Sequence, residues 1–189
     1  MGYISRPRRT GGSHPSGNTK RAGGLERIKE ECGVMGVFGG PEVTRRVVMG
    51  LYSLQHRGQE SVGVATTNGE SIRVLKRMGL VTELNREEKE VESMTGIASI
   101  GHVRYSTTGN SNINNAQPML VSTKRGPIAV AHNGNIVNAP EIRKRMEEEG
   151  SIFQSTSDTE IILHLIARSQ KPNLIDAISD TLAQLTGSF

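Results

Sequence analysis

The chain has 189 residues, of which 34% are hydrophobic and 3% aromatic, with one Cys and a formal net charge of +4; this is enough for one domain with a sizeable core and too little for two ordinary ones. A single Cys excludes an internal disulfide framework, and no apolar run approaches the ~20 residues of a membrane span or the apolar middle of a secretory signal, so we expect a cytoplasmic protein with no membrane partner. The charge excess lies in residues 1–31, which have seven basic and three acidic side chains, whereas residues 32–189 are balanced; this argues against nucleic acid as a partner.

Residues 1–24 are rich in Gly, Ser, Arg and Pro and contain almost no apolar side chains, which predicts a disordered segment. We interpret residues 1–31 as a leader or propeptide and residues 32–189 as the folded domain. Nothing in residues 1–24 assigns them a role of their own.

Apolar periodicity predicts a mixture of strands and helices from residue 33 onward. In chain order we expect a strand at 33–38, a helix at 41–55, strands at 61–67 and 71–76, a charged helical piece at 86–93, strands at 97–103, 119–123 and 127–132, helices at 140–149, 157–166 and 173–184, and the beginning of a strand at 185–189. Pro41 and Glu42 suit the first turn of the first helix. Asn68-Gly69 is a hairpin signal. Strands and helices that do not strictly alternate favour layered α+β packing.

Cys32 has unusual surroundings for a structural cysteine. It directly follows the charged leader and opens the apolar run Gly-Val-Met-Gly-Val-Phe. A nucleophile that becomes the first residue of a shortened chain needs such a boundary, because a terminal α-amine near pKa 8 can accept a thiol proton and a peptide N–H cannot. The alternative is a buried and inert cysteine, the common fate of a single free Cys.

Four further segments place polar groups where predicted strands or helices end, which is where sites on rigid scaffolds usually lie. They are Leu54-Gln55-His56-Arg57-Gly58-Gln59-Glu60-Ser61, Gly101-His102-Val103-Arg104-Tyr105-Ser106-Thr107-Thr108-Gly109, Ala131-His132-Asn133-Gly134-Asn135 and Ser157-Asp158-Thr159-Glu160. Together with Cys32 they resemble the glutaminase domain of the class II glutamine amidotransferases, which are N-terminal-nucleophile hydrolases, and within that group they are most similar to the amidophosphoribosyltransferase family.

This resemblance implies a four-layer αββα sandwich with two mainly antiparallel sheets. It implies hydrolysis of glutamine to glutamate and ammonia by Cys32, after cleavage of the Glu31–Cys32 bond. Asn133 and Gly134 then correspond to the oxyanion hole, although Asn-Gly is also the favoured pair of a type I′ turn.

The resemblance also implies residues that bind glutamine. Arg104 corresponds to the arginine that binds the α-carboxylate, Asp158 to the aspartate that binds the α-ammonium, and Arg57 to an arginine near the nucleophile, while Thr107 adds a hydroxyl contact. Asp158 has an alternative role as a helix cap, and Ser157 with Glu160 reads as a capping box. The polar loop 105–117 corresponds to a segment that closes over glutamine, or it is an ordinary loop.

The partners and cofactors that we expect follow from the same resemblance. The substrate is L-glutamine, and the acceptor domain, a phosphoribosyltransferase normally in the same chain, is absent, so residues 32–189 read as a glutaminase domain truncated at its C-terminal end. The full-length family makes 5-phosphoribosylamine in the first step of purine synthesis and is homo-oligomeric. We expect no cofactor in this chain, since Mg²⁺ and an iron–sulfur cluster belong to the other half, and no metal, because the five His show no H-E-x-x-H spacing.

Three other interpretations compete with this one. Cys32 could pair with a His as in class I amidotransferases, although the Gly-x-Cys-x-Gly elbow is missing. The chain could instead be a non-catalytic domain that binds glutamine and keeps its leader. It could also be the glutaminase domain of another class II amidotransferase.

Overall fold

The computed structural model describes residues 32–105 and 112–189. Its first half contains β1 (Gly33–Phe38), α1 (Val43–Ser53), the 3₁₀ turn η1 (Gln55–Arg57), β2 (Ser61–Thr67), β3 (Ile72–Met78), α2 (Thr82–Asn85), α3 (Glu88–Ser93) and β4 (Ala98–Arg104). Its second half contains η2 (Ile113–Asn115), β5 (Met119–Thr123), β6 (Gly126–Val130), β7 (Asn135–Ile136), α4 (Ala139–Glu148), α5 (Thr159–Arg168), α6 (Leu174–Leu182) and β8 (Gly187–Ser188).

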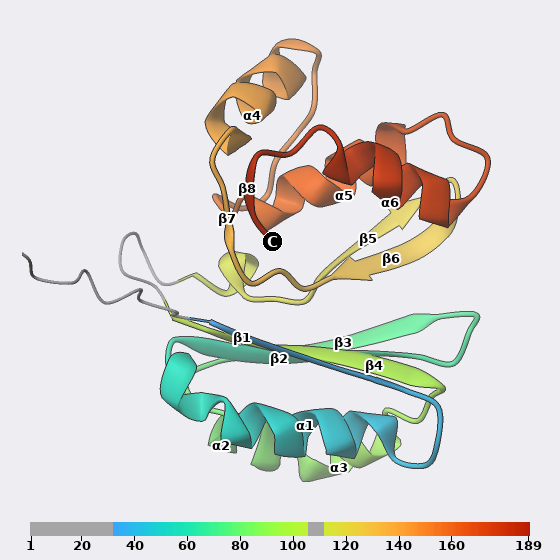
Figure 1. Ribbon diagram of the computed structural model, residues 1–189. Coiled ribbons are helices and arrows are strands. Elements are labelled where there is room, and N and C mark those ends of the chain that lie inside the picture. The colour runs from blue at the N-terminus through green and yellow to red at the C-terminus, as the bar shows by residue number, and fades with distance from the viewer. Residues whose placement is uncertain (1–31, 106–111) are drawn as a thin grey trace, which may run out of the picture.

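The elements stack in four layers (Figure 1). Strands β1 to β4 form one antiparallel sheet in the order β1-β4-β2-β3, and α1, α2 and α3 cover one of its faces. The antiparallel pair β5–β6 lies against the other face and is covered in turn by α5 and α6, while β7 and β8 form a separate antiparallel pair. The α+β class and the αββα order expected from the sequence are confirmed.

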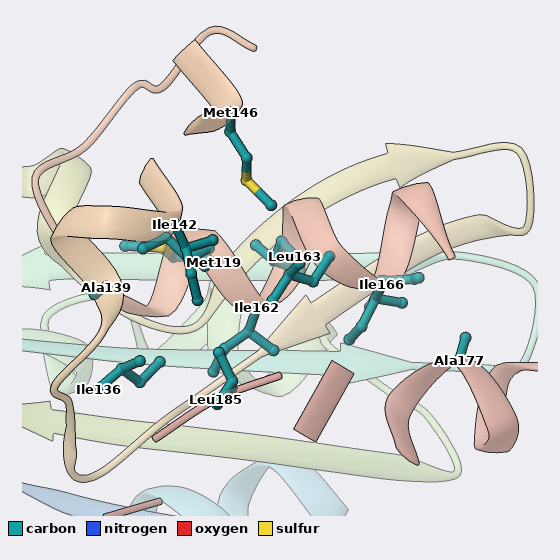
Figure 2. Close-up of a cluster of buried hydrophobic side chains, with 13 residues drawn as sticks. Met119, Ile136, Ala139, Ile142, Met146, Ile162, Leu163, Ile166, Ala177 and Leu185 are labelled. Carbon is teal, nitrogen blue, oxygen red and sulfur yellow. The ribbon is translucent and has the colours of Figure 1, made fainter. Parts of the chain in front are cut away.

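Each outer helical layer encloses its own apolar core. Val62, Val64 and Val103 point from β2 and β4 toward α1, where Val47 and Leu51 meet them. The second core fills the space between β5–β6 and helices α4 to α6 (Figure 2), and its members are Met119, Ile128, Ile136, Ala139, Ile142, Met146, Ile161, Ile162, Leu163, Leu165, Ile166, Ala177 and Leu185. The amphipathic stripes of these helices therefore face the sheets, as their periodicity predicts.

The structure corrects one local prediction. Glu42 is not in the first turn of α1, because it has φ 51°, in the left-handed region that a side chain with a Cβ adopts only at a cost, and the helix begins at Val43. The charged helical piece expected at 86–93 is found as α3, and a further short helix, α2, precedes it. The predicted hairpin at Asn68-Gly69 is confirmed, since Gly69 has φ 99° and joins β2 to β3.

Among the residues that the structure describes, none of the helices combines the length and the apolar character needed to cross a bilayer.

Candidate active site

Cys32 lies at the entrance of β1, where three other segments meet it. Its carbonyl oxygen accepts hydrogen bonds from Arg57 Nε at 2.8 Å and from Asn133 Nδ2 at 3.2 Å. Its thiol Sγ donates to the carbonyl oxygen of Tyr105 at 3.7 Å. Arg57 and Asn133, which were both predicted to belong to the site, therefore hold the backbone of the predicted nucleophile by hydrogen bonds.

Local packing explains why Arg57 reaches Cys32. A Cβ placed on Gly58 would lie 2.6 Å from the carbonyl carbon of Val103, so only glycine lets η1 lie against the end of β4. The β1–β4 register pairs Gly33 with Val103, which brings Cys32 to the same end of the sheet. Arg57 therefore contacts the nucleophile residue itself and is not among the side chains that line the neighbouring cavity.

A cavity of about 630 Å³ opens beside Cys32. Its walls include Arg104, Tyr105, Gly134 and Asp158, so it gathers predicted site residues from β1, from the end of β4, from the segment after β6 and from the start of α5. Two other hollows, of about 890 and 670 Å³, share no lining residue with it. The cavity is large enough for a free amino acid.

Asn133 and Gly134 do not form the type I′ turn that the dipeptide favours. That turn needs a positive φ at both residues, and neither has one. Glycine is required at 134 for another reason: a Cβ there would collide with the carbonyl oxygen of Ser188 and would lie 2.9 Å from Nε2 of His132. The turn alternative is therefore wrong, and a contact with a distant part of the chain sets this segment.

The two buried histidines hold the segment that carries Asn133. His102 Nε2 donates to the carbonyl oxygen of His132 at 3.1 Å, and the His132 N–H donates to Gln117 Oε1 at 2.7 Å. Burial lowers the pKa of His102 to about 4, so its ring is neutral near pH 7 and supplies one N–H donor. Gln117 in turn donates from Nε2 to Thr159 Oγ1 at 3.0 Å.

Asp158 occupies the N-cap position of α5 but makes no capping hydrogen bond with its side chain. Its Oδ2 instead accepts from the N–H of Ile136 at 2.9 Å, and Oδ1 lies 3.9 Å from Nδ1 of His132. The side chain is 25% exposed and lines the cavity. The alternative role of Asp158 as a helix cap is therefore wrong.

The capping box predicted from Ser157 and Glu160 is also absent. The carboxylate of Glu160 reaches back and accepts hydrogen bonds from the N–H groups of Gln154 and Ser155, both at 2.8 Å. Its role is structural, as expected, but it stabilises the loop before α5 and not the first turn of the helix.

Arg104 lies at the cavity wall and pairs with the carboxylate of Glu60, for which no role was predicted. Its Nη1 donates to Glu60 Oε1, and the two side chains are 18% and 9% exposed. The only sequence signal for this pair is that Glu60 directly precedes β2. The register that pairs Ser61 with Arg104 then places Glu60 next to the arginine.

Two predicted site residues, Glu31 and Thr107, lie outside the described residues, as does most of the first half of the loop 105–117. Within residues 32–105 and 112–189, no group of three or more His, Cys, Asp or Glu side chains is arranged to hold a metal ion.

Similarity to known proteins gives independent evidence about this site. Residues 102–189 match the family model described as a glutamine amidotransferase domain. The chain is 44% identical over 171 residues to the amidophosphoribosyltransferase of Methanothermobacter thermautotrophicus, covering 88% of this chain and 36% of the relative. It is 44% identical over 166 residues to the enzyme of the same name from Bacillus subtilis, covering 87% of this chain and 35% of that protein.

Solved structures give the same result. The glutamine phosphoribosylpyrophosphate amidotransferase of B. subtilis, solved with ADP and GMP, aligns over 82% of this chain and 33% of its own, with a TM-score of 0.75 and 44% identity. A structure described as the allosteric regulatory enzyme of purine biosynthesis aligns over the same shares with a TM-score of 0.77 and 44% identity. The chain thus spans about a third of the length of the relatives that it matches.

Proposed function

Because this chain carries a glutamine amidotransferase domain of the amidophosphoribosyltransferase type, we propose that it hydrolyses L-glutamine to glutamate and ammonia with Cys32 as an N-terminal nucleophile. The observation that carries the proposal is the cavity beside Cys32, where Arg104, Gly134 and Asp158 come together from separate segments.

Cleavage of the Glu31–Cys32 bond is the activating step. It converts the backbone nitrogen of Cys32 into a primary amine with a pKa near 8, which accepts the proton of the thiol. Arg57 and Asn133 bind the carbonyl oxygen of Cys32, so the residue stays in place when the leader leaves.

The thiolate then attacks the side-chain amide carbon of glutamine. As the C–S bond forms, the carbonyl electron pair moves to the amide oxygen, and the second N–H of the Asn133 amide and the N–H of Gly134 supply donors for this oxyanion. The proton on the Cys32 amine passes to the departing nitrogen, and ammonia leaves. Water cleaves the thioester, which releases glutamate and regenerates the thiol.

Arg104 and Asp158 give the cavity one cationic and one anionic wall. A free α-amino acid carries an α-carboxylate and an α-ammonium, and these groups complement the two walls. Thr107 adds a hydroxyl contact to the substrate in the proposal. The glutaminase step itself needs no cofactor or metal, so a chelator leaves the rate unchanged.

The histidines near the cavity do not favour a class I mechanism. His102 Nε2 donates a hydrogen bond to the carbonyl oxygen of His132. The ring nitrogens of His132 lie within hydrogen-bond distance of Thr159 Oγ1 and of the carbonyl oxygen of Ser188. Both rings are buried parts of the framework. An N-terminal amine is therefore the better candidate for the base.

We further propose that the ammonia serves amidophosphoribosyl transfer, in which a phosphoribosyltransferase unit uses it to form 5-phosphoribosylamine for purine synthesis, within a cytoplasmic homo-oligomer. The names of the relatives support this assignment. Neither nucleic acid nor a membrane takes part.

The decisive experiment measures intact mass and ammonia release on the same purified sample. We expect a chain that begins at Cys32 and releases one ammonia for each glutamate formed. The matched control, Cys32→Ala, retains residues 1–31 and releases none. A chain that begins at Cys32 without releasing ammonia would contradict the proposal, and so would full turnover with residues 1–31 intact.

A further inference from the structure

Glu60 is fixed by its backbone between two strand ends. Its N–H donates to the carbonyl oxygen of Arg104 at 2.9 Å, and its carbonyl oxygen accepts from the N–H of Gly79 at 2.7 Å. It thus ties the end of β4 to the residue that follows β3. The position of its side chain is set by the sheet and not by a mobile loop.

The carboxylate of Glu60 has a single partner among the described residues. Oε1 accepts from Arg104 Nη1, whereas Oε2 is buried and has no hydrogen-bond partner. A buried carboxylate with an unused oxygen is costly, and a buried ion pair is often no more stabilising than apolar packing of the same volume. Stability alone therefore gives a weak reason for a Glu at this position.

Arg104 is the other half of the pair and is the cation at the cavity wall. A guanidinium recognises a carboxylate through two parallel N–H donors, and this recognition requires a defined orientation of its plane. With one N–H of Nη1 bound to Glu60, the edge formed by Nε and Nη2 keeps both of its parallel donors. Because the pair carries no net charge, the direction of these donors decides how well Arg104 binds a carboxylate.

We propose that Glu60 is a positioning residue that orients the guanidinium of Arg104 for the α-carboxylate of the substrate. This inference rests on the proposed function and extends it: the site selects amino acids with a free α-carboxylate, and Glu60 sets that selectivity without touching the substrate. The opposite role, in which Glu60 competes with the substrate for Arg104, predicts tighter substrate binding when Glu60 is removed.

The test compares Glu60→Ala with Glu60→Gln in the full chain. Glu60→Ala removes the acceptor, and we expect KM for glutamine to rise about 10- to 100-fold with kcat changed less than about threefold, in the range that loss of a hydrogen bond to a charged group produces. Glu60→Gln keeps an acceptor oxygen of the same reach, so it recovers part of the loss. If Glu60→Ala fails to fold, a KM raised about three- to tenfold in Glu60→Gln decides the question.

A second substrate separates positioning from a merely structural role. L-Glutaminamide has no α-carboxylate for Arg104 to bind, so Glu60→Ala and the unsubstituted protein should use it with equal kcat/KM. The matched control is Glu87→Ala, because Glu87 also pairs with an arginine, Arg77, at 2.9 Å, but lies outside the cavity. We expect this control to leave KM for glutamine unchanged.

Calorimetric binding of glutamine to Cys32→Ala from which residues 1–31 have been removed at an engineered protease site, with and without Glu60→Ala, keeps the inference distinct from the proposed function. Binding weakened by the Glu60 substitution supports the inference. Binding or KM that is unchanged or improved in Glu60→Ala overturns it and leaves the glutaminase assignment intact, as does an equal loss with both substrates. If the unsubstituted protein neither hydrolyses nor binds glutamine, the proposed function and this inference are both overturned.

Discussion

The two faces of the sheet formed by β1 to β4 differ in the side chains that they present. Toward α1, Val62, Val64 and Val103 are buried among the aliphatic side chains of the helix. Toward β5–β6, the same two strands present Gly63, His102 and Arg104. The face toward α1 buries apolar side chains. The face toward β5–β6 buries fewer apolar side chains and instead holds polar groups in place.

This difference shows how the site is built into a small domain. A Cβ on Gly63 would collide with the carbonyl oxygen of Gln117, so the absence of a side chain lets the backbone that carries Gln117 approach the sheet. Gln117 and His102 then hold the two backbone groups of His132, directly before Asn133. We therefore expect substitutions on the two faces to separate activity from stability.

The largest effect is expected from Cys32→Ala. Loss of the nucleophile should reduce glutamine hydrolysis on the order of 10⁴-fold or more, since no other group in the proposed mechanism forms the thioester. Ammonia release is the measurement, and the thermal midpoint should change little because Cys32 lies at the entrance of a strand. Hydrolysis within tenfold of the unsubstituted rate would show that the site lies elsewhere.

Asn133→Ala should lower kcat on the order of 10²- to 10³-fold, the usual cost of one oxyanion donor. The matched control is Asn173→Ala, because Asn173 is also an amide but caps α6 by accepting from the N–H of Asp176 at 2.9 Å. It should cost about 1 kcal/mol of stability and leave kcat unchanged. Equal kcat values for the two variants would exclude Asn133 from the chemistry.

Leu51→Ala tests the apolar face. The side chain is 0% exposed at the contact between α1 and the sheet, so its truncation should cost about 2–5 kcal/mol of unfolding free energy. Denaturant unfolding measures the loss. The fraction that remains folded should keep its KM for glutamine, and a change in KM would mean that the two faces are coupled.

The polar face should make stability depend on pH through His102. Its pKa in the folded protein is lowered to about 4 from the usual 6.5, so the unfolded chain binds the proton first as the pH falls. The stability present above pH 6.5 should be lost between pH 6.5 and about 4, by on the order of 3 kcal/mol. His102→Gln should remove this dependence, whereas replacing the exposed His56 with Gln should preserve it; the same slope in both variants would assign it to other groups.

Most of the sheet could be predicted from the sequence because its periodic signals are local. The apolar strand at 33–38 and the Asn68-Gly69 hairpin need only neighbouring residues to be recognised, and both are found where expected. The short strand β7 could not be predicted in this way, nor could its pairing with β8, which lies within the segment 185–189 where the beginning of a strand was expected. The two strands pair Asn135 with Ser188 and Ile136 with Gly187, and two residues carry no periodicity.

The residues of the candidate site also differ in whether local sequence was enough to predict them. Cys32, Arg104 and Asp158 belong to motifs that can be recognised in sequence, and the fold brings all three to one cavity. Glu60 was missed because its importance depends on a strand register that joins residues 44 positions apart. The dipeptide statistics failed at Asn133-Gly134 because the carbonyl oxygen of Ser188, and not a local turn, sets that backbone.

That contact with Ser188 has a consequence for the order of events during synthesis. Gly134 packs directly against Ser188, and β7 has no partner strand until β8 has formed. Because the ribosome releases the chain from its N-terminus at ~5–20 residues per second, Cys32 emerges well before the segment that closes its pocket. In the proposed mechanism, leader removal that depends on this pocket therefore waits until residue 188 has cleared the exit tunnel, so the α-amine of Cys32 is not released before the pocket is complete.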